Sequence, residues 1–346
     1  MTTDLKTVRI VLIGLGNLGR RFCAILAEKE AHLAERYGLR LILVGAADSR
    51  GAVHDRHGLD PACIARIKQA GGSVADYPGA RRSVSGLDLL GDVNADLLCE
   101  ASPVNLSDEA EPGLTHVRTA LTRGMHVVTP NKGPLVLAYR ELHALARAHH
   151  VQLRFDGTVA GGLPALNIGT RDLRGATVHR IEAVPNLTTG FVMDQLAQGA
   201  SWETALARAR AEGTLEADPS FDLDGWDAAA KLVILVNAIM EIPVQLADVE
   251  RTGITHLRPE DLRAARRAGQ TYKLLASAER TSSRAVSLRV APVPLPDDHF
   301  LARLNHRAMG IIYYTDIYGT LMAAIDEPTP VPSAATMLRD ILDIYA

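Results

Sequence analysis

A glycine-rich turn between an apolar strand and a helix constrains the fold of this chain more than any other feature. The β-branched run at residues 8–13 leads directly into Gly14-x-Gly16-x-x-Gly19, and a helical pattern follows over residues 20–37. This order is the context in which a G-x-G-x-x-G motif binds a dinucleotide. Gly14 permits the tight turn, Gly16 lets the backbone approach a pyrophosphate, and Gly19 lets the helix pack closely on the strand.

Further cofactor contacts are expected on both sides of this helix. Its N-terminal N–H groups, at Asn17 and Leu18, would face the phosphates. A second apolar strand over residues 41–48 ends at Asp48, and an acid there can hydrogen-bond ribose hydroxyls, which favours NAD. Arg50, two residues further on, could instead hold the 2′-phosphate of NADP. The sequence leaves NAD and NADP open.

Strands and helices continue to alternate up to residue 150. We expect strands over residues 95–100 and 125–129, and helices over residues 114–123 and 135–149. This alternation predicts a doubly wound parallel sheet of the Rossmann type.

Two polar segments directly follow strands of this predicted sheet. They are Ala101-Ser102-Pro103 and Thr129-Pro130-Asn131-Lys132. Ligands of such sheets bind at the carboxyl ends of the strands. Ser102 and Lys132 are therefore candidate cofactor-binding residues.

The pattern changes after Val151. A glycine-rich loop over residues 156–164 could bring backbone carbonyls or amides close to a ligand or an ion, and helices are expected over residues 188–198 and 201–212. An acidic, irregular segment over residues 216–224 comes next.

A helix over residues 225–240 then carries Asp227 and Lys231. These residues are four apart and share one helix face. An exposed pair of this kind contributes only about 0.3–0.5 kcal/mol. Alanines and an apolar run flank the pair and indicate a buried helix instead. A lysine held by one aspartate in a cleft can act as a proton donor, so the sequence leaves a surface pair and a catalytic pair open.

The composition excludes several classes of protein. The chain has 346 residues, of which 47% are hydrophobic and 22% charged, with a net charge of −3. These values fit one large or two ordinary globular domains rather than a disordered chain or a nucleic-acid-binding protein. No run of about 18 apolar residues suggests a membrane span. The polar N-terminus and three scattered cysteines favour the cytoplasm, and the twelve histidines show no metal-ligand spacing.

Lysine is rare in this chain. Only six of the 37 basic residues are lysine, at positions 6, 29, 68, 132, 231 and 273. Arginine is always charged, so a retained lysine is a candidate for a group that must titrate. Lys132 and Lys231 lie in the motifs above, whereas Lys6, Lys29, Lys68 and Lys273 lie where a surface role is sufficient.

Three of these segments, in this order, resemble motifs of the homoserine dehydrogenase family. Thr129–Lys132 resembles its T-[AP]-N-K motif, Thr158–Pro164 its T-V-x-[AG]-G-x-P loop, and Glu216–Lys231 its long acidic block. The resemblance extends from Val8 to about Ala291.

The resemblance implies NAD(P)-dependent reduction of L-aspartate 4-semialdehyde to L-homoserine, and its reverse, in amino-acid biosynthesis. Lys231 would be the general acid/base, supported by Asp227, and Lys132 would polarise the carbonyl beside the nicotinamide. The residues implied in substrate binding are Glu216, Asp222 and Thr188.

The resemblance also implies an ion site and a domain plan. A monovalent cation such as Na⁺ would be held at Asp156, Val159, Gly161 and Leu163. The Rossmann domain would span residues 1–150 and be joined by a C-terminal return segment, 325–346. A second α+β domain, 151–324, would bind substrate and form a homodimer.

The chain departs from the family pattern at several positions. Asp156 replaces a longer glutamate, Leu187 replaces a glycine, and three prolines replace glycines within residues 326–333. We expect no regulatory ACT domain, because the chain ends at Ala346.

Two alternative functions stay open. The chain could be a related oxidoreductase that acts on another amino or hydroxy acid aldehyde, or a non-catalytic dinucleotide-binding sensor.

Overall fold

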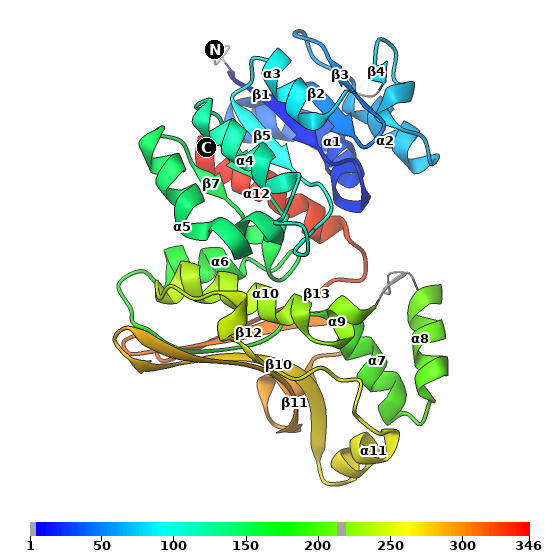
Figure 1. Cartoon of the computed structure of the whole chain (residues 1–346), viewed down its shortest axis with the longest axis vertical. Coiled ribbons are helices and arrows are strands. Elements are labelled where there is room, and N and C mark those ends of the chain that lie inside the picture. The colour runs from blue at the N-terminus through cyan, green and yellow to red at the C-terminus, as the bar shows by residue number, and fades with distance from the viewer. Residues whose placement is uncertain (1–4, 83, 213–218) are drawn as a thin grey trace. The chain divides into compact units, whose positions relative to one another are not determined.

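The computed structural model describes residues 5–82, 84–212 and 219–346 and divides the chain into two compact units (Figure 1). The first unit contains residues 1–162 together with the C-terminal residues 329–346. The second unit contains residues 163–328. Each unit is built on its own sheet.

The first unit contains a seven-stranded sheet in the order β4-β3-β2-β1-β5-β6-β7. From β2 to β7 all neighbouring strands are parallel, and β3 and β4 add an antiparallel edge. The strands are β1 Lys6–Ile13, β2 Leu39–Asp48, β3 Gly51–His54, β4 Arg81–Arg82, β5 Leu97–Glu100, β6 His126–Val128 and β7 Leu153–Arg154.

Helices cover both faces of this sheet, as expected for a doubly wound fold. Helix α1 packs against α2 and α12, and α4 packs against α3 and α5. The helices are α1 Asn17–Tyr37, α2 Pro61–Gln69, α3 Gly86–Asp92, α4 Gly113–Thr122, α5 Lys132–Ala148 and α12 Val331–Tyr345. Met337 and Ile341 of α12 lie in the same apolar core as Ile10 and Phe22. Burial of these side chains holds the C-terminal helix in the first unit.

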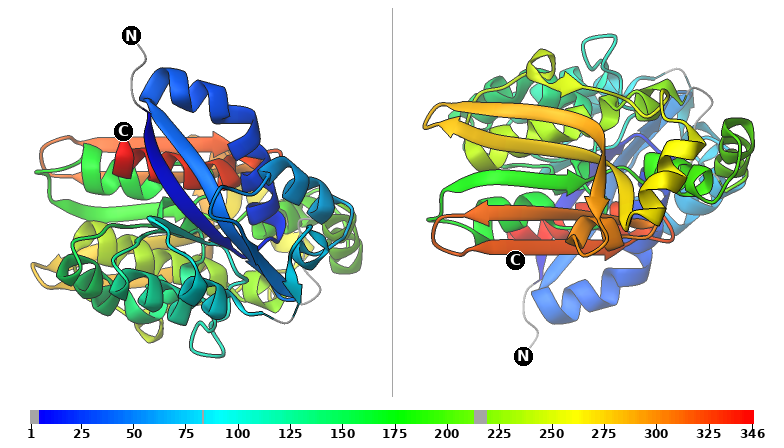
Figure 2. Two further views of the ribbon diagram at one scale, coloured as in Figure 1. Left: turned by 90° about the horizontal axis from the view of Figure 1, so that it is seen from above. Right: turned by 90° about the horizontal axis from the view of Figure 1, so that it is seen from below.

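The second unit contains a six-stranded sheet in the order β13-β12-β8-β10-β11-β9 (Figure 2, right). All its pairs are antiparallel except that of β11 with the short β9. The strands are β8 Val178–Val184, β9 Glu250–Arg251, β10 Gln270–Ser282, β11 Ala285–Pro296, β12 Ala308–Thr315 and β13 Thr320–Asp326.

The helices of the second unit include one that is almost wholly buried. In α10, residues 227–230 and 232–235 are all buried, because the helix packs on β10 and β11. The helices are α6 Ala165–Asn167, α7 Leu187–Ala197, α8 Trp202–Ala211, α9 Ser220–Leu223, α10 Trp226–Leu235 and α11 Pro259–Arg267. A π-helical turn, Val236–Met240, extends α10.

The predicted fold class, a Rossmann-type sheet with a second α+β unit, is confirmed. The first boundary lies at Gly162 rather than at residue 150, because β7 pairs with β6 in the first sheet. The return begins at Thr329 rather than at residue 325, because β13 extends to Asp326. Among the described residues, no helix is long and apolar enough to cross a membrane.

Candidate functional site

The glycine turn of the first unit has the geometry that its sequence predicts. Gly14 has a φ of +93°, and a Cβ there would lie 2.2 Å from the backbone of Ala101. A Cβ on Gly19 would lie 1.9 Å from the Gly14 carbonyl oxygen. A Cβ on Gly16, by contrast, would meet no described atom within 4 Å. Packing of the backbone therefore requires glycine at positions 14 and 19. At Gly16 the space beside the backbone is open.

The N-terminus of α1 begins at this turn. Gly16 is the N-cap residue and provides no side-chain hydrogen bond to the first turn. Asn17 and Leu18 occupy the first two helical positions, where backbone N–H groups have no intrahelical acceptor. The Asn17 side chain instead accepts from Arg21, on the next turn. Such an uncapped N-terminus can bind the phosphates of a dinucleotide.

Asp48, at the end of β2, is occupied by partners within the first unit. Its carboxylate accepts hydrogen bonds from Lys68 Nζ at 2.7 Å and Ser73 Oγ at 2.7 Å. It also accepts from the backbone N–H groups of Val74 and Arg50, each at 3.0 Å. Burial alone would raise the pKa of Asp48, but these four bonds outweigh it and lower the pKa to about 2.

A carboxylate has about four lone-pair sites, and in Asp48 all are filled. The ribose-binding role expected for Asp48 stays a prediction, and a ribose hydroxyl would have to share or replace one of these bonds. The sequence did not reveal these partners, of which Lys68 lies on α2 and Ser73 and Val74 follow it. Arg50 remains exposed beside it.

A buried polar network joins the two loops that follow β5 and β6. Glu100 is fully buried and accepts from the Ser102 backbone N–H at 3.1 Å and from Asn131 Nδ2 at 3.0 Å. The Ser102 hydroxyl also donates to Glu100. Asn131 in turn caps α5 by accepting from the Gly133 N–H at 3.0 Å, which places Lys132 at the first helical position. Sequence reasoning missed Glu100, which reads as the last residue of an ordinary strand.

The loop predicted to hold a monovalent ion already contacts a cation of the protein. Asp156 is buried, and its carboxylate pairs with the guanidinium of Arg339 on α12. Val159 is also buried, Gly161 has a φ of +55°, and Leu163 belongs to the second unit. Among the described residues, no group of three or more His, Cys, Asp or Glu side chains could hold a metal ion.

In the second unit, the predicted pair of Asp227 and Lys231 is buried on α10. Lys231 Nζ lies 2.7 Å from Asp227 Oδ2 and donates to the Pro185 carbonyl oxygen at 2.6 Å. The Lys231 side chain is 13% exposed and that of Asp227 is 6% exposed. This burial excludes the surface ion pair as an interpretation.

Asn186 organises the acids around this lysine. Its Nδ2 donates to Asp222 Oδ1 and to Asp227 Oδ2, each at 2.7 Å. Its Oδ1 accepts from the Thr189 N–H at 2.9 Å and so caps α7. The sequence analysis gave Asn186 no role. Its position at the start of a helix was the available signal.

Asp222 lies in the same cluster. Burial, followed by the charge of Asp227, raises the pKa of Asp222, and the hydrogen bonds from Asn186 and Thr188 partly oppose this. The structure thus brings Lys231, Asp227, Asp222 and Thr188 together. Glu216 lies outside the described residues.

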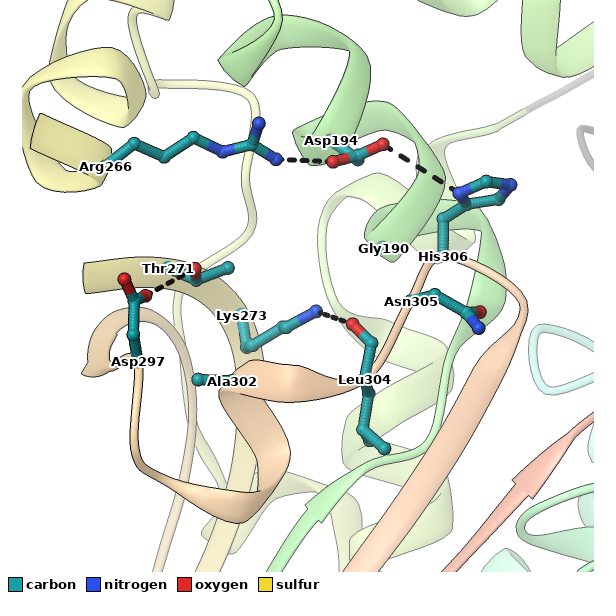
Figure 3. A pocket seen from close by; sticks show the side chains of 10 residues that line it. All are labelled: Gly190, Asp194, Arg266, Thr271, Lys273, Asp297, Ala302, Leu304, Asn305 and His306. Atoms are coloured by element: carbon teal, nitrogen blue, oxygen red, sulfur yellow. Dashed lines mark hydrogen bonds and ion pairs between the residues drawn. The ribbon is translucent and has the colours of Figure 1, made fainter. Parts of the chain in front are cut away.

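The expectation that four lysines need only a surface role is wrong for two of them. Lys68 pairs with Asp48, as described above, and Lys273 is buried beside a cavity of about 330 Å³ (Figure 3). Lys273 Nζ donates to the Leu304 carbonyl oxygen at 2.6 Å. None of the residues lining this cavity is a predicted site residue.

Comparison with known protein families gives a match in each of the two units. The model of the homoserine dehydrogenase family matches residues 164–342, and that of its NAD-binding domain matches residues 14–156. An NAD(+)-dependent homoserine dehydrogenase of Pseudomonas canavaninivorans is 32% identical over 97% of this chain and 96% of its own. The chain belongs to the homoserine dehydrogenase family.

Solved structures of this family share the fold throughout. A putative homoserine dehydrogenase from Archaeoglobus fulgidus has a TM-score of 0.86 and 29% identity, and the match covers 98% of this chain and 99% of that one. A hyperthermophilic archaeal homoserine dehydrogenase in complex with NADPH has a TM-score of 0.84 and 26% identity, with 98% of both chains covered. The resemblance seen in the motifs is confirmed, and the chain is an NAD(P)-dependent oxidoreductase of this family.

Proposed function

We propose that this chain interconverts L-aspartate 4-semialdehyde and L-homoserine with NAD(P)H, using Lys231 as the general acid/base. The observation that carries the proposal is the ammonium of Lys231, buried and held by Asp227 Oδ2 and the Pro185 carbonyl oxygen. A lysine ammonium has three N–H donors. Two are directed at these acceptors, and the third would donate to a substrate oxygen.

The acids around Lys231 suit an amino-acid substrate. A substrate with an α-ammonium group needs carboxylates, and the developing alkoxide needs a cation beside it. Asp222 and Asp227 lie on either side of the Asn186 amide and would face the ammonium, with Thr188 and Glu216 completing the contacts. The nicotinamide supplies the hydride when it is bound, and Lys231 gives the proton to the carbonyl oxygen.

The first unit would bind the cofactor. The turn of Gly14, Gly16 and Gly19, with the N–H groups of Asn17 and Leu18, would hold the pyrophosphate. Ser102 and Lys132, at the carboxyl ends of parallel strands, would lie toward the nicotinamide, where the Lys132 ammonium would polarise the substrate carbonyl. Arg50 would contact a 2′-phosphate, and Asp48 would support the loop that carries Arg50.

Steady-state kinetics test this function directly. We expect L-homoserine oxidation with a kcat in the ordinary enzyme range, about 1–10³ s⁻¹, with NAD or NADP. The ratio of kcat/KM for the two cofactors measures the contribution of the 2′-phosphate. Turnover below about 0.01 s⁻¹ with both cofactors would favour the alternative substrate, since Leu187 stands beside Thr188 at the start of α7. Cofactor binding without turnover of any aldehyde would favour the sensor.

Two glycine substitutions separate cofactor binding from folding. Gly16→Ala should leave the Tm within about 1 °C but weaken NADPH binding about tenfold or more, because the new methyl group occupies the open side of the turn. Gly19→Ala should lower the Tm markedly, because its Cβ overlaps the Gly14 carbonyl. Thermal melts and cofactor fluorescence measure the two effects. An equal loss of Tm in both variants would show that Gly16 serves only packing.

We also propose a homodimer formed through the second unit. Strand β13 is an edge of its sheet, and the β12–β13 hairpin exposes Ile317, Tyr318 and Met322. An unpaired edge with apolar side chains is suited to pairing with a second copy. Analytical ultracentrifugation would show a monomer at micromolar concentration if this is wrong.

We also propose that the protein works in a reducing compartment such as the cytoplasm. Its free cysteines, two of them buried, suit such a compartment.

A further inference from the structure

We propose that the guanidinium of Arg339 occupies the place at Asp156 where the family resemblance implies a monovalent cation, so that this protein works without such an ion. The inference concerns the first unit alone. It is independent of the proposed substrate and can be tested without turnover.

Arg339 contacts one of the residues expected to hold the cation, Asp156, and the carbonyl of Gly162, which lies between two others. Nη1 donates to the Gly162 carbonyl oxygen at 2.9 Å, and Nη2 donates to the carboxylate of Asp156. Both acceptors lie in the loop that follows β7. Hard metal cations also take carboxylate and carbonyl oxygens as ligands. One side chain therefore uses a carboxylate and a carbonyl from the loop in which the ion was expected.

The negative charge of Asp156 is already paired within the first unit. Asp156 contributes one negative charge, and Arg339 is always protonated. Asp340, the next residue on α12, is buried and accepts from the Asp156 backbone N–H at 3.1 Å. Burial, followed by the charge of Asp156, raises the pKa of Asp340 well above its usual range. A metal ion at Asp156 would therefore compete with the guanidinium that already pairs with this carboxylate.

The packing of α12 fixes the backbone from which Arg339 extends. Its neighbours on the helix, Met337 and Ile341, are buried in the core of the first unit. The two contacts of Arg339, to Asp156 and to the Gly162 carbonyl, then direct its guanidinium to this loop. An ion added at Asp156 would meet a like charge beside a carboxylate that is only 2% exposed, where such repulsion is less screened than in water. The residues present therefore do not fit the implied ion.

The unmodified protein provides the first test. Thermal melts and homoserine oxidation are measured in NaCl, KCl and tetramethylammonium chloride at equal ionic strength. We expect Tm values within about 1 °C and rates within about twofold. A saturable rise in Tm with Na⁺ or K⁺, absent with tetramethylammonium, would overturn the proposal even if no turnover is detected.

Removal of the guanidinium should create a requirement for a cation. Arg339→Ala leaves Asp156 unpaired, so Na⁺, K⁺ or millimolar guanidinium should raise its Tm by about 5 °C or more over tetramethylammonium. Arg339→Lys keeps a tethered cation and should show no such response. A folded Arg339→Ala protein that is indifferent to all these cations would contradict the proposal.

A matched control removes a different arginine. Arg118 of the same unit pairs with Glu141 on the surface through two hydrogen bonds, at 2.6 and 2.8 Å. Arg118→Ala should show no ion-specific change in Tm. If Arg339→Ala does not fold in tetramethylammonium, the proposal is tested with the unmodified protein and with Arg339→Lys. A rise in the Tm of either protein that is specific to Na⁺ or K⁺ refutes the proposal.

Discussion

Replacement of Lys231 by methionine should lower kcat about 10²–10⁴-fold, because the only proton donor proposed for the substrate oxygen is lost. The Kd for NADPH should change by less than about threefold, since the glycine turn belongs to the other unit. The variant leaves the buried carboxylate of Asp227 without its cation, so its stability should fall by about 3–5 kcal/mol. Stopped-flow or steady-state kinetics at saturating substrate measure the loss, and a thermal melt confirms that the protein is folded.

Two further variants separate charge from proton transfer. Lys231→Arg keeps a cation beside Asp227, but a guanidinium does not release its proton near neutral pH. It should therefore retain most of the stability and still lose kcat. Lys273→Met is the matched control, because Lys273 is also shielded from solvent in the same unit and donates to a backbone carbonyl (Figure 3). It should keep kcat within about threefold. A folded Lys231→Met protein with kcat within tenfold of the original would remove Lys231 from its role.

Replacement of Asn186 by alanine should lower kcat/KM about 10²-fold, because its amide bridges Asp222 and Asp227. The bond from Asn186 favours the charged form of Asp222, so its loss raises the pKa of that carboxyl further. The acid limb of the pH profile of kcat/KM should therefore move to higher pH. This shift distinguishes a positioning role from a loss of stability.

Ser201 provides the control for the capping role of Asn186. Its hydroxyl accepts from the Thr204 N–H at 3.2 Å and caps α8 in the same unit. Each cap contributes about 1 kcal/mol to stability. Ser201→Ala should therefore lower the Tm only by the contribution of a cap, with an unchanged pH profile. If Asn186→Ala behaves in the same way, Asn186 only caps its helix.

Local sequence signals predicted much of the site. The strand, glycine turn and helix at the N-terminus form one continuous segment, and their geometry depends on φ angles and close approaches within it. The pair of Asp227 and Lys231 lies one helical turn apart, so its contact follows from helix geometry alone. The motif of Thr129 to Lys132 likewise carries its own helix cap, Asn131.

Local sequence signals did not predict contacts between segments that are far apart in the chain. Asp48 is held by Lys68 and Ser73, and Asp156 by Arg339, 183 residues further along the chain. In a chain with so many arginines, composition does not show which one reaches a given acid. Lys273 was misjudged for the same reason, because its burial depends on how the segment around Leu304 folds over β10.

The sequence by itself determined that this chain forms a dinucleotide-binding sheet with a second α+β unit, and that a lysine and an aspartate share one face of a helix. These properties depend on short-range geometry and on hydrophobic periodicity, which neighbouring residues express together. The tertiary structure decided that Asp48 is saturated, that Asn186 joins two acids, and that Arg339 stands at Asp156. In each case, burial of the apolar core brings together polar groups that are far apart in the sequence. Short-range sequence patterns do not predict which of these groups will pair.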